Sequence, residues 1–270
     1  TAATPIRIRN AVELAYLARQ VNNGGQTLQL LYGKSIDNIA DDNLKGFAGY
    51  HFALSNDIDL KRQNWTPIGN EDSPFMGNFN GDGHVIKGLK ISIHNETDAD
   101  VYAGLFGYVL NGTFCNLGIW LAPEGIEIFS SQSDICAGGL AGCIFAYIHN
   151  CYVEAEGNGT IRCRGTGDNF VYIGGIAGVM NKVLTHCYTT VNMEAINNNK
   201  VRIGGIVGQG GPTITYTYAT GNIKCSDISA RASIGGIMGR AMPATIKNCL
   251  ALNKEFTTCL LYTSDAADEL

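Results

Sequence analysis

The chain has 270 residues, of which 45% are hydrophobic, and its formal net charge is −5. A chain of this length and composition can bury a core, which excludes disorder as its main state. The 19 basic and 24 acidic residues leave no basic cluster, so nucleic acid is excluded as a partner. No apolar run approaches the roughly 18 residues of a membrane-spanning helix. Charged residues make up only 16%, against about 25% in an average domain, which indicates an uncharged, turn-rich fold.

The first 60 residues differ from the rest of the chain. Apolar residues from Ala11 to Val21 recur with helical spacing and end at Asn-Asn-Gly-Gly, a sequence typical of a helix C-terminus. We expect a short amphipathic helix there, followed by a strand over 50–60. Because the open end of a repeat fold needs a cover, residues 1–60 are interpreted as an N-terminal cap. A strand pair is predicted over 75–93, around the turn sequence Asn80-Gly81-Asp82-Gly83.

A glycine motif of the form Gly-Gly-aliphatic-x-Gly recurs along the second part of the chain, with Ala103 replacing the first glycine once. Its five copies are 103–107, 138–142, 174–178, 204–208 and 235–239. The copies lie 30 to 36 residues apart, which is the length of one solenoid turn. The flanking segments are short, β-branched or aromatic, and show no helical spacing. We therefore predict an all-β fold, a right-handed parallel β-helix (β-solenoid), with five such turns over residues 61–256.

A second motif follows each glycine motif after 11 to 13 residues and contains a cysteine in four of the five turns. The residues assigned to this column are Cys115, Cys151, Cys187, Thr217 and Cys249. We expect an inward ladder of small side chains, with the cysteines as buried free thiols, because parallel side chains do not readily give the torsion of a disulfide. Asn150 and Asn248 are expected to form left-handed bends.

The repeat pattern ends near Phe256, and residues 257–270 are interpreted as a tail outside the fold. The segment Cys259–Leu270 matches no repeat position and resembles translated sequencing-adapter sequence. We therefore expect the natural chain to continue, with further C-terminal turns or domains.

Several segments together resemble a known family. They are Asn56-Asp57-Ile58-Asp59-Leu60, Trp65-Thr66-Pro67-Ile68-Gly69, the stretch 75–86 and Gly104-Leu105-Phe106-Gly107. Their order and spacing resemble the GLUG-motif surface proteins of anaerobic gut bacteria, over roughly residues 10–256. The resemblance implies a secreted or cell-surface β-solenoid with an adhesin-like role, and it offers no catalytic motif. Similar repeats also precede the catalytic domain of some immunoglobulin-A-cleaving peptidases, which implies an accessory region of a larger surface peptidase as an alternative.

Two groups of residues are candidates for ligand contact. Tyr152, Tyr188 and Tyr218 form a column directly after the cysteine column. If they point outward, sugar rings could stack on them; if they point inward, they belong to the core. We favour core or half-buried packing, because so regular a column also serves stacking. In the loop between Glu154 and Asp168, Arg162 and Arg164 are the best candidates for contact with an acidic ligand.

The sequence predicts no metal site and no cofactor. Asp57 and Asp59 lie on one face of a predicted strand and are weak candidates for calcium. Calcium needs six to eight oxygen ligands, and only two carboxylates occur locally, so turn-capping or solvated roles are favoured for both.

We expect a non-catalytic module that contacts glycans or host or matrix proteins, because long repeat folds offer repeated contacts along a rigid flank. The alternative is a polysaccharide-active β-helix enzyme, a lyase or hydrolase, which would need paired carboxylates or a base. Acidic residues are scattered between 101 and 256, and only Glu154 and Glu194 are expected near corresponding places in neighbouring turns.

Overall fold

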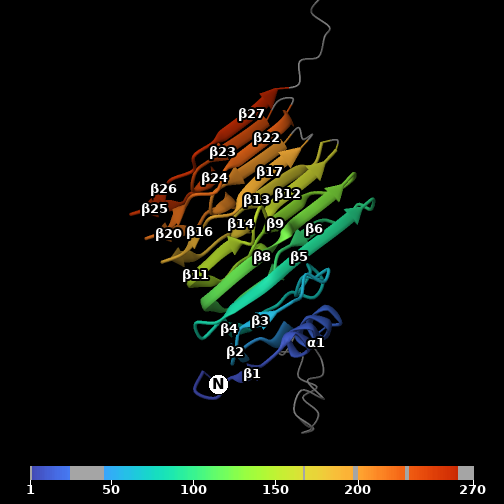
Figure 1. The fold of residues 1–270 in the computed structure, drawn as a ribbon, viewed down its shortest axis with the longest axis vertical. Helices are drawn as coiled ribbons and strands as arrows, with labels where there is room; N and C mark the ends of the chain where they lie inside the picture. The colour runs from blue at the N-terminus through green and yellow to red at the C-terminus, as the bar shows by residue number, and fades with distance from the viewer. Residues whose placement is uncertain (1, 25–45, 167, 197–199, 229–230, 261–270) are drawn as a thin grey trace, which may run out of the picture.

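The computed structural model describes residues 2–24, 46–166, 168–196, 200–228 and 231–260. Within these ranges the chain forms a β-solenoid in which strands stack on one another from the N-terminal end to the last turn (Figure 1). Every strand pair in the described part of the chain is parallel, as stacked turns require. The predicted fold class, an all-β solenoid with one short N-terminal helix, is confirmed. Residues 261–270, most of the predicted tail, lie outside the described ranges.

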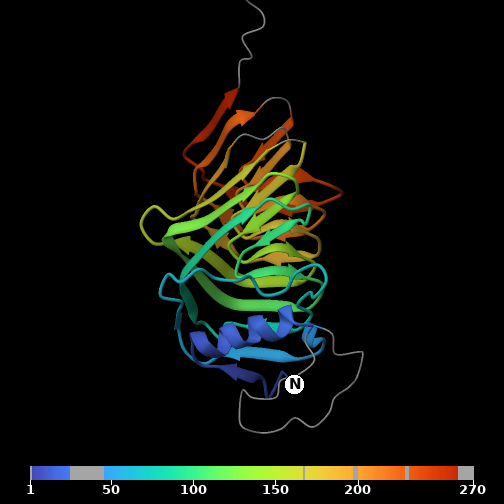
Figure 2. The ribbon, with the colours of Figure 1, turned by 90° about the vertical axis from the view of Figure 1, so that its right-hand side faces the viewer.

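The helix α1 (Ala11–Asn22) begins where the apolar spacing begins. The side chain of Asn10 caps it by accepting a hydrogen bond from the backbone N–H of Glu13, 3.0 Å away. Leu14, Leu17 and Val21 are fully buried. Figure 2 shows α1 lying across the N-terminal end of the stack, where it covers the first strands. No helix in the described ranges combines the length and the apolar character needed to cross a membrane.

The largest sheet contains strands from the N-terminal region and from all five repeat turns. Its strands are β1 (Ile6–Ile8), β2 (His51–Leu54), β3 (Ile58–Asp59), β4 (Asn78–Asn80), β5 (Val85–Asn95), β8 (Thr113–Ser130), β11 (Tyr147–Ala155), β12 (Thr160–Gly165), β15 (Val183–Thr185), β16 (Tyr188–Thr189), β17 (Asn192–Ile196), β20 (Thr213–Thr215), β21 (Tyr218–Ala219), β22 (Ile223–Ile228), β25 (Thr245–Lys247), β26 (Leu250–Ala251) and β27 (Phe256–Leu260). Because β1 and β2 belong to this sheet, parallel stacking begins before residue 61.

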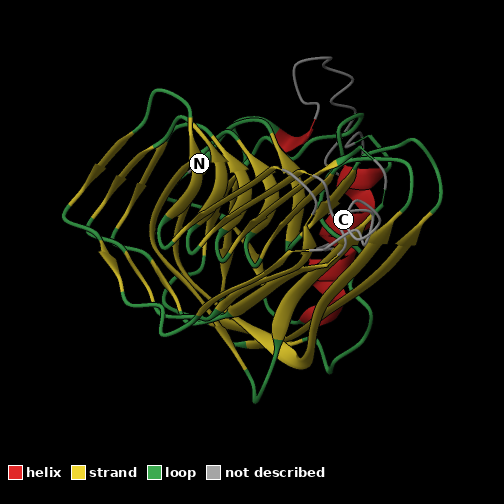
Figure 3. Ribbon diagram, turned by 90° about the horizontal axis from the view of Figure 1, so that it is seen from above, coloured by secondary structure: helices red, strands yellow, loops and turns green. Residues whose placement is uncertain are grey.

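Two further sheets are built only from the repeat turns, and the glycine motif connects them within each turn. The first sheet contains β6 (Val101–Ala103), β9 (Ile135–Gly138), β13 (Phe170–Gly174), β18 (Lys200–Gly204) and β23 (Arg231–Gly235). The second contains β7 (Phe106–Val109), β10 (Ala141–Ile144), β14 (Ala177–Met180), β19 (Val207–Gly210) and β24 (Met238–Ala241). Viewed along the stack, the strands of successive turns follow the same path (Figure 3).

The two strand segments predicted before the repeats are present, with different details. The stretch 50–60 contains two short strands, β2 and β3, instead of one. The predicted turn at Asn80–Gly83 separates β4 from β5, but these strands do not pair with each other. Each pairs with strands of neighbouring turns, because the turn is a corner of the solenoid and the chain does not reverse into a hairpin there.

The second glycine of each motif allows the turn to pack closely against the opposite sheet. A Cβ atom placed on Gly175 would lie 2.4 Å from Cγ2 of Thr189 and 2.6 Å from the carbonyl oxygen of Gly205. The aliphatic residue that follows is fully buried in four of the five turns: these residues are Leu105, Leu140, Ile176 and Ile206. The motif therefore combines a bulky core residue with a neighbour that must lack a side chain.

The cysteine column differs from the prediction in its first member. Cys151 pairs in register with Leu117, and Cys115 pairs with His149. Cys115 therefore lies two positions away from the inward column and is only partly buried. The predicted alignment was wrong because the first turn needs one more residue between its glycine motif and this column.

The rest of the column is formed as expected. The backbone N–H of Cys151 contacts Sγ of Cys187 at 3.5 Å, and the N–H of Cys187 contacts Oγ1 of Thr217 at 3.4 Å. Cys151 and Cys187 are buried, whereas Cys249, in the last turn, is partly exposed. All eight cysteines of the described ranges are free thiols, which confirms that part of the prediction.

The bend before each of these positions has a left-handed backbone. Asn150 and Asn248 have φ angles of 53° and 54°, as predicted from their type. Asn116, in the first turn, has the same conformation, and its side-chain oxygen accepts a hydrogen bond from Asn150 Nδ2 at 2.8 Å. This amide contact links the corners of two successive turns.

Candidate functional site

The three predicted tyrosines form a stack on the outer surface of the large sheet. Tyr152, Tyr188 and Tyr218 are in register on β11, β16 and β21. Their ring centroids are 4.9 Å apart in both pairs, with interplanar angles of 1° and 0°. The flanking residues Cys151 and Val153 are buried, so the tyrosines project outward. The expected half-buried packing is present, and the alternative of a core position is wrong.

The stacking limits how a ligand could use these rings. Both faces of Tyr188 are covered by its two neighbours, so a sugar ring cannot stack on it. What remains toward solvent is a row of ring edges and hydroxyl groups, with Tyr218 38% exposed at the end of the row. Ring edges carry partial positive charge and hydroxyls both donate and accept hydrogen bonds, so the row suits polar, oxygen-rich ligands.

Charged and aromatic side chains flank the tyrosine stack. The Tyr188 hydroxyl donates a hydrogen bond to Oε1 of Glu154 at 2.9 Å. Burial, followed by this carboxylate, raises the pKa of Tyr188 above its usual range. Trp120 pairs in register with Glu154, and the Lys87 ammonium lies 5.4 Å from the Trp120 ring centroid. We call Lys87, Trp120, Glu154 and the three tyrosines the tyrosine face.

The two aspartates considered for calcium have separate structural roles. Asp57 forms ion pairs with Lys87 at 2.9 Å and with His84 at 3.4 Å, and it accepts a hydrogen bond from the N–H of Val85. The bond from Lys87, followed by that from Val85, lowers the pKa of Asp57. Asp59 accepts a hydrogen bond from the N–H of Lys61 at 2.7 Å, which caps the turn. Within the described ranges, no group of three metal-binding side chains is found.

Arg162 belongs to a ladder of alternating charge and is already paired. Glu127, Arg162, Glu194 and Lys224 are in register on β8, β12, β17 and β22. Arg162 lies 2.8 Å from Glu194 and 3.9 Å from Glu127, and Lys224 lies 2.7 Å from Glu194. Burial would raise the pKa of Glu194, but hydrogen bonds from Lys224 and Arg162 lower it. An acidic ligand would have to compete with these carboxylates for Arg162.

Arg164 lies two residues further along β12, on the same outward side as Arg162. It is exposed, and it pairs in register with Phe129 and Ile196, which carry no charge. Among the described residues it forms no ion pair. Of the two predicted arginines, Arg164 is therefore the one whose guanidinium is available to a ligand.

Glu154 and Glu194 are not equivalent, contrary to the expectation. Glu194 is in register with Arg162, whereas Glu154 is in register with Trp120. The register offset falls from 36 residues between Tyr152 and Tyr188 to 32 between Arg162 and Glu194. The second turn thus carries four extra residues after Glu154, which separates the two carboxylates.

A second cluster was missed in the sequence, although its tyrosines flank the first glycine motif. The rings of Tyr102 and Tyr108 meet edge to face with centroids 5.0 Å apart. The Tyr102 hydroxyl lies 3.2 Å from Glu71 Oε2 and 3.5 Å from Asp100 Oδ2. Burial raises the pKa of Tyr108 to about 12 and that of Tyr102 still further. The cluster presents two carboxylates beside aromatic edges, which suits hydrogen-bonding ligands with hydroxyl groups.

Comparisons with known proteins give a likeness in fold and a partial likeness in sequence. No family model matches the chain. A protein of Evansella cellulosilytica described as "Putative Gly-rich membrane protein" is 36% identical over 122 residues, which are 42% of this chain. The chain spans only 13% of the length of that relative. A crystal structure from Bacteroides ovatus, described as "a putative immunoglobulin A1 protease", shares the fold with a TM-score of 0.54 and 22% identity, over 97% of this chain and 85% of that one.

Proposed function

We propose that the chain is a non-catalytic, adhesin-like β-solenoid of a secreted or cell-surface protein, and that it contacts glycans or host or matrix proteins through the tyrosine face. The observation that carries this proposal is the outward stack of Tyr152, Tyr188 and Tyr218 on three successive turns. A rigid row of identical groups suits a ligand that is itself extended, because several weak contacts form at once.

The chemistry of the face favours an oxygen-rich ligand. Tyrosine hydroxyls and the Glu154 carboxylate can bond to sugar hydroxyls or to polar protein groups. Tyrosine also adds contact area at low cost in conformational entropy. The stacked rings are already ordered before a ligand arrives, so binding orders little that was mobile.

The state of the carboxylates supports a non-catalytic role. Glu154 accepts the Tyr188 hydrogen bond, and Glu194 is held between Arg162 and Lys224. A general acid works best with a raised pKa, but the pKa of Glu194 is lowered. The two carboxylates also occupy different columns, so they do not form the acid–base pair that a polysaccharide hydrolase would need.

Two further points support a surface location within a longer protein. The partial relative is described as a membrane protein, and the segments of this chain resemble GLUG-motif surface proteins. The likeness in fold to a structure described as an immunoglobulin A1 protease favours a second candidate, an accessory region of a larger surface peptidase. Under that candidate, the chain would bind immunoglobulin A1 without cleaving it.

Immobilised glycans, matrix proteins and immunoglobulin A1 would test both candidates, with binding followed by biolayer interferometry. Tyr188→Phe keeps the ring stack but removes the hydroxyl bond to Glu154, and we expect it to weaken binding several-fold. Tyr188→Ala should weaken binding further. Tyr216→Phe is the matched control, because Tyr216 is exposed and stacks on His186 outside the tyrosine face. Binding that is unchanged in both Tyr188 variants would refute the proposal, as would release of product from any of these substrates.

A further inference from the structure

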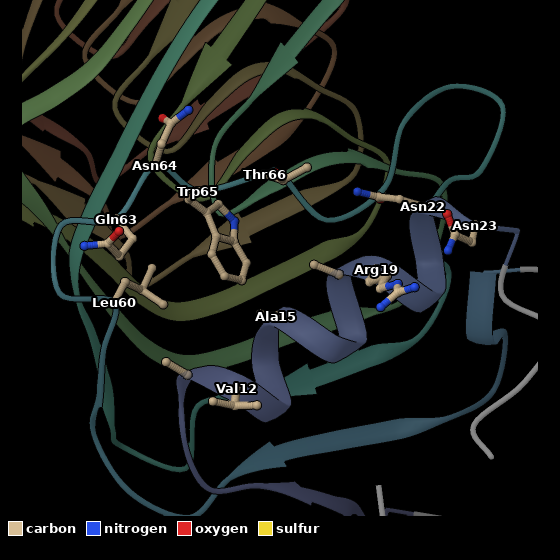
Figure 4. A pocket seen from close by; sticks show the side chains of 12 residues that line it. Val12, Ala15, Arg19, Asn22, Asn23, Leu60, Gln63, Asn64, Trp65 and Thr66 are labelled. Carbon is tan, nitrogen blue, oxygen red and sulfur yellow. The ribbon is translucent and has the colours of Figure 1, made fainter. Parts of the chain in front are cut away.

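A pocket of about 600 Å³ lies at the N-terminal end, between α1 and the segment that leads from β3 toward β4 (Figure 4). Its lining combines small apolar side chains with amides and one charge. The lining residues are Ala11, Val12, Ala15, Ala18, Arg19, Asn22, Asn23, Leu60, Gln63, Asn64, Trp65 and Thr66. The volume lies within the range of about 300 to 1,000 Å³ that is usual for small-molecule sites.

The helix α1 is apolar on more than the side that faces the core. Leu14 and Leu17 are fully buried, as expected for a capping helix. On another side, Val12 is 78% exposed, and the exposed Ala15 follows three residues later. Figure 4 shows Val12, Ala15 and Arg19 on the part of the helix that borders the pocket. A surface helix usually places polar residues on its outer face, so this apolar stretch is unusual.

The opposite wall of the pocket is held in place by hydrogen bonds. The Trp65 indole N–H donates to the carbonyl oxygen of Leu105 at 3.0 Å, and only 8% of the residue is exposed. Asn64 exchanges two hydrogen bonds with the backbone of Ser92, at 2.7 and 3.2 Å. At the rim, Asn22 donates to Pro67 and accepts from Gly69. The wall is therefore formed before any ligand binds, which lowers the entropic cost of binding.

Arg19 is the charged residue of the lining. Its position in the last turn of α1 is favourable toward the helix dipole. It forms no ion pair with any described residue, whereas Arg9, nearer the start of α1, pairs with Glu13 at 2.9 Å. The pocket thus offers an apolar interior and one guanidinium group, which binds a carboxylate through two parallel hydrogen bonds.

We propose that this pocket binds a small amphipathic carboxylate. Its apolar chain would pack against Val12, Ala15 and Trp65, and its carboxylate would pair with Arg19. A neutral apolar molecule would satisfy the interior but would leave the arginine unpaired, and a sugar would leave the apolar wall without a partner. The site shares no residue with the tyrosine face, so its test is independent of the proposed function.

Trp65 provides the signal for the experiment. The chain contains two tryptophans, so Trp120→Phe leaves Trp65 as the single emitter. Titration with decanoate, kept below its micelle concentration, should give a saturable change in emission. Decanol, the neutral analogue, should bind about tenfold more weakly, a difference of about 1.4 kcal/mol.

Variants separate the charge from the cavity. Arg19→Gln should reduce the affinity for decanoate to that for decanol, and Ala15→Phe should abolish binding of both by filling the pocket. Arg164→Gln, the matched control, removes another exposed arginine outside the pocket and should change nothing. Circular dichroism checks that each variant is folded. The absence of saturable binding, equal affinities for the two probes, or an unchanged decanoate affinity in folded Arg19→Gln would each overturn the proposal.

Discussion

Arg162 and Glu194 face each other across two neighbouring turns, with Nε of the arginine 2.8 Å from Oε2 of the glutamate. Only 12% of the Glu194 side chain is exposed, and Lys224 pairs with it from the next turn. A partly buried carboxylate with a cation on either side is compensated for the loss of water. Arg162 therefore has a structural role in aligning turns, which a sequence motif alone does not reveal.

Arg162→Ala should destabilise the fold by about 1 kcal/mol, because it leaves a partly buried carboxylate with one partner instead of two. Urea unfolding followed by circular dichroism would measure the change. Arg164→Ala should cost less, since Arg164 pairs with no described carboxylate. An equal loss in the two variants would contradict the structural role of the ladder.

The pH dependence of stability should show the contribution of Glu194. Its pKa in the folded chain lies below the ordinary value of 4.5, so the folded state favours the charged form. Such a group contributes its full stability above the unfolded pKa, and this contribution is lost as the pH falls through the folded pKa. Between about pH 5 and pH 3, the unfolding free energy should fall less steeply in Glu194→Gln than in the wild type. The exposed Glu124→Gln should retain the wild-type slope, and identical slopes in all three chains would exclude the effect.

The buried thiols should react only after unfolding. Burial raises the pKa of Cys187 to about 12 and that of Cys151 well above its usual value, so neither forms a thiolate at neutral pH. Ellman titration of the native chain should label neither residue, and both should react in denaturant. The partly exposed Cys115 should be labelled earlier. Peptide mapping that finds Cys151 labelled in the native chain, or linked to Cys187, would disagree with the structure.

Gly175→Ala should be strongly destabilising, by about 2 kcal/mol or more, because the added methyl would overlap Thr189 and the backbone of Gly205. Thermal unfolding would show this as a lower Tm. Gly83→Asn is the control, since nothing lies within 4 Å of a Cβ atom there and asparagine tolerates its φ of 84°. A mild effect at Gly175 would mean that the two sheets can separate without cost.

Much of the fold could be inferred from local patterns. The glycine motif repeats at the length of one turn, and the bends at Asn150 and Asn248 follow from the ease with which asparagine adopts a positive φ. The helix from Ala11 was also visible, because its apolar spacing and its end signals are local. These features depend on the residue itself and on neighbours a few positions away, so the sequence alone determines them.

The alignment of one turn on the next was decided only by the tertiary structure. One additional residue in the first turn moves Cys115 out of the inward column, and four additional residues in the second bring Arg162 beside Glu194. Successive side chains of a strand point to opposite faces, so an odd change in loop length exchanges the inward and outward positions, and any change alters the partner in the next turn. Loop lengths set these contacts, and the motifs carry no record of which residues the loops absorb.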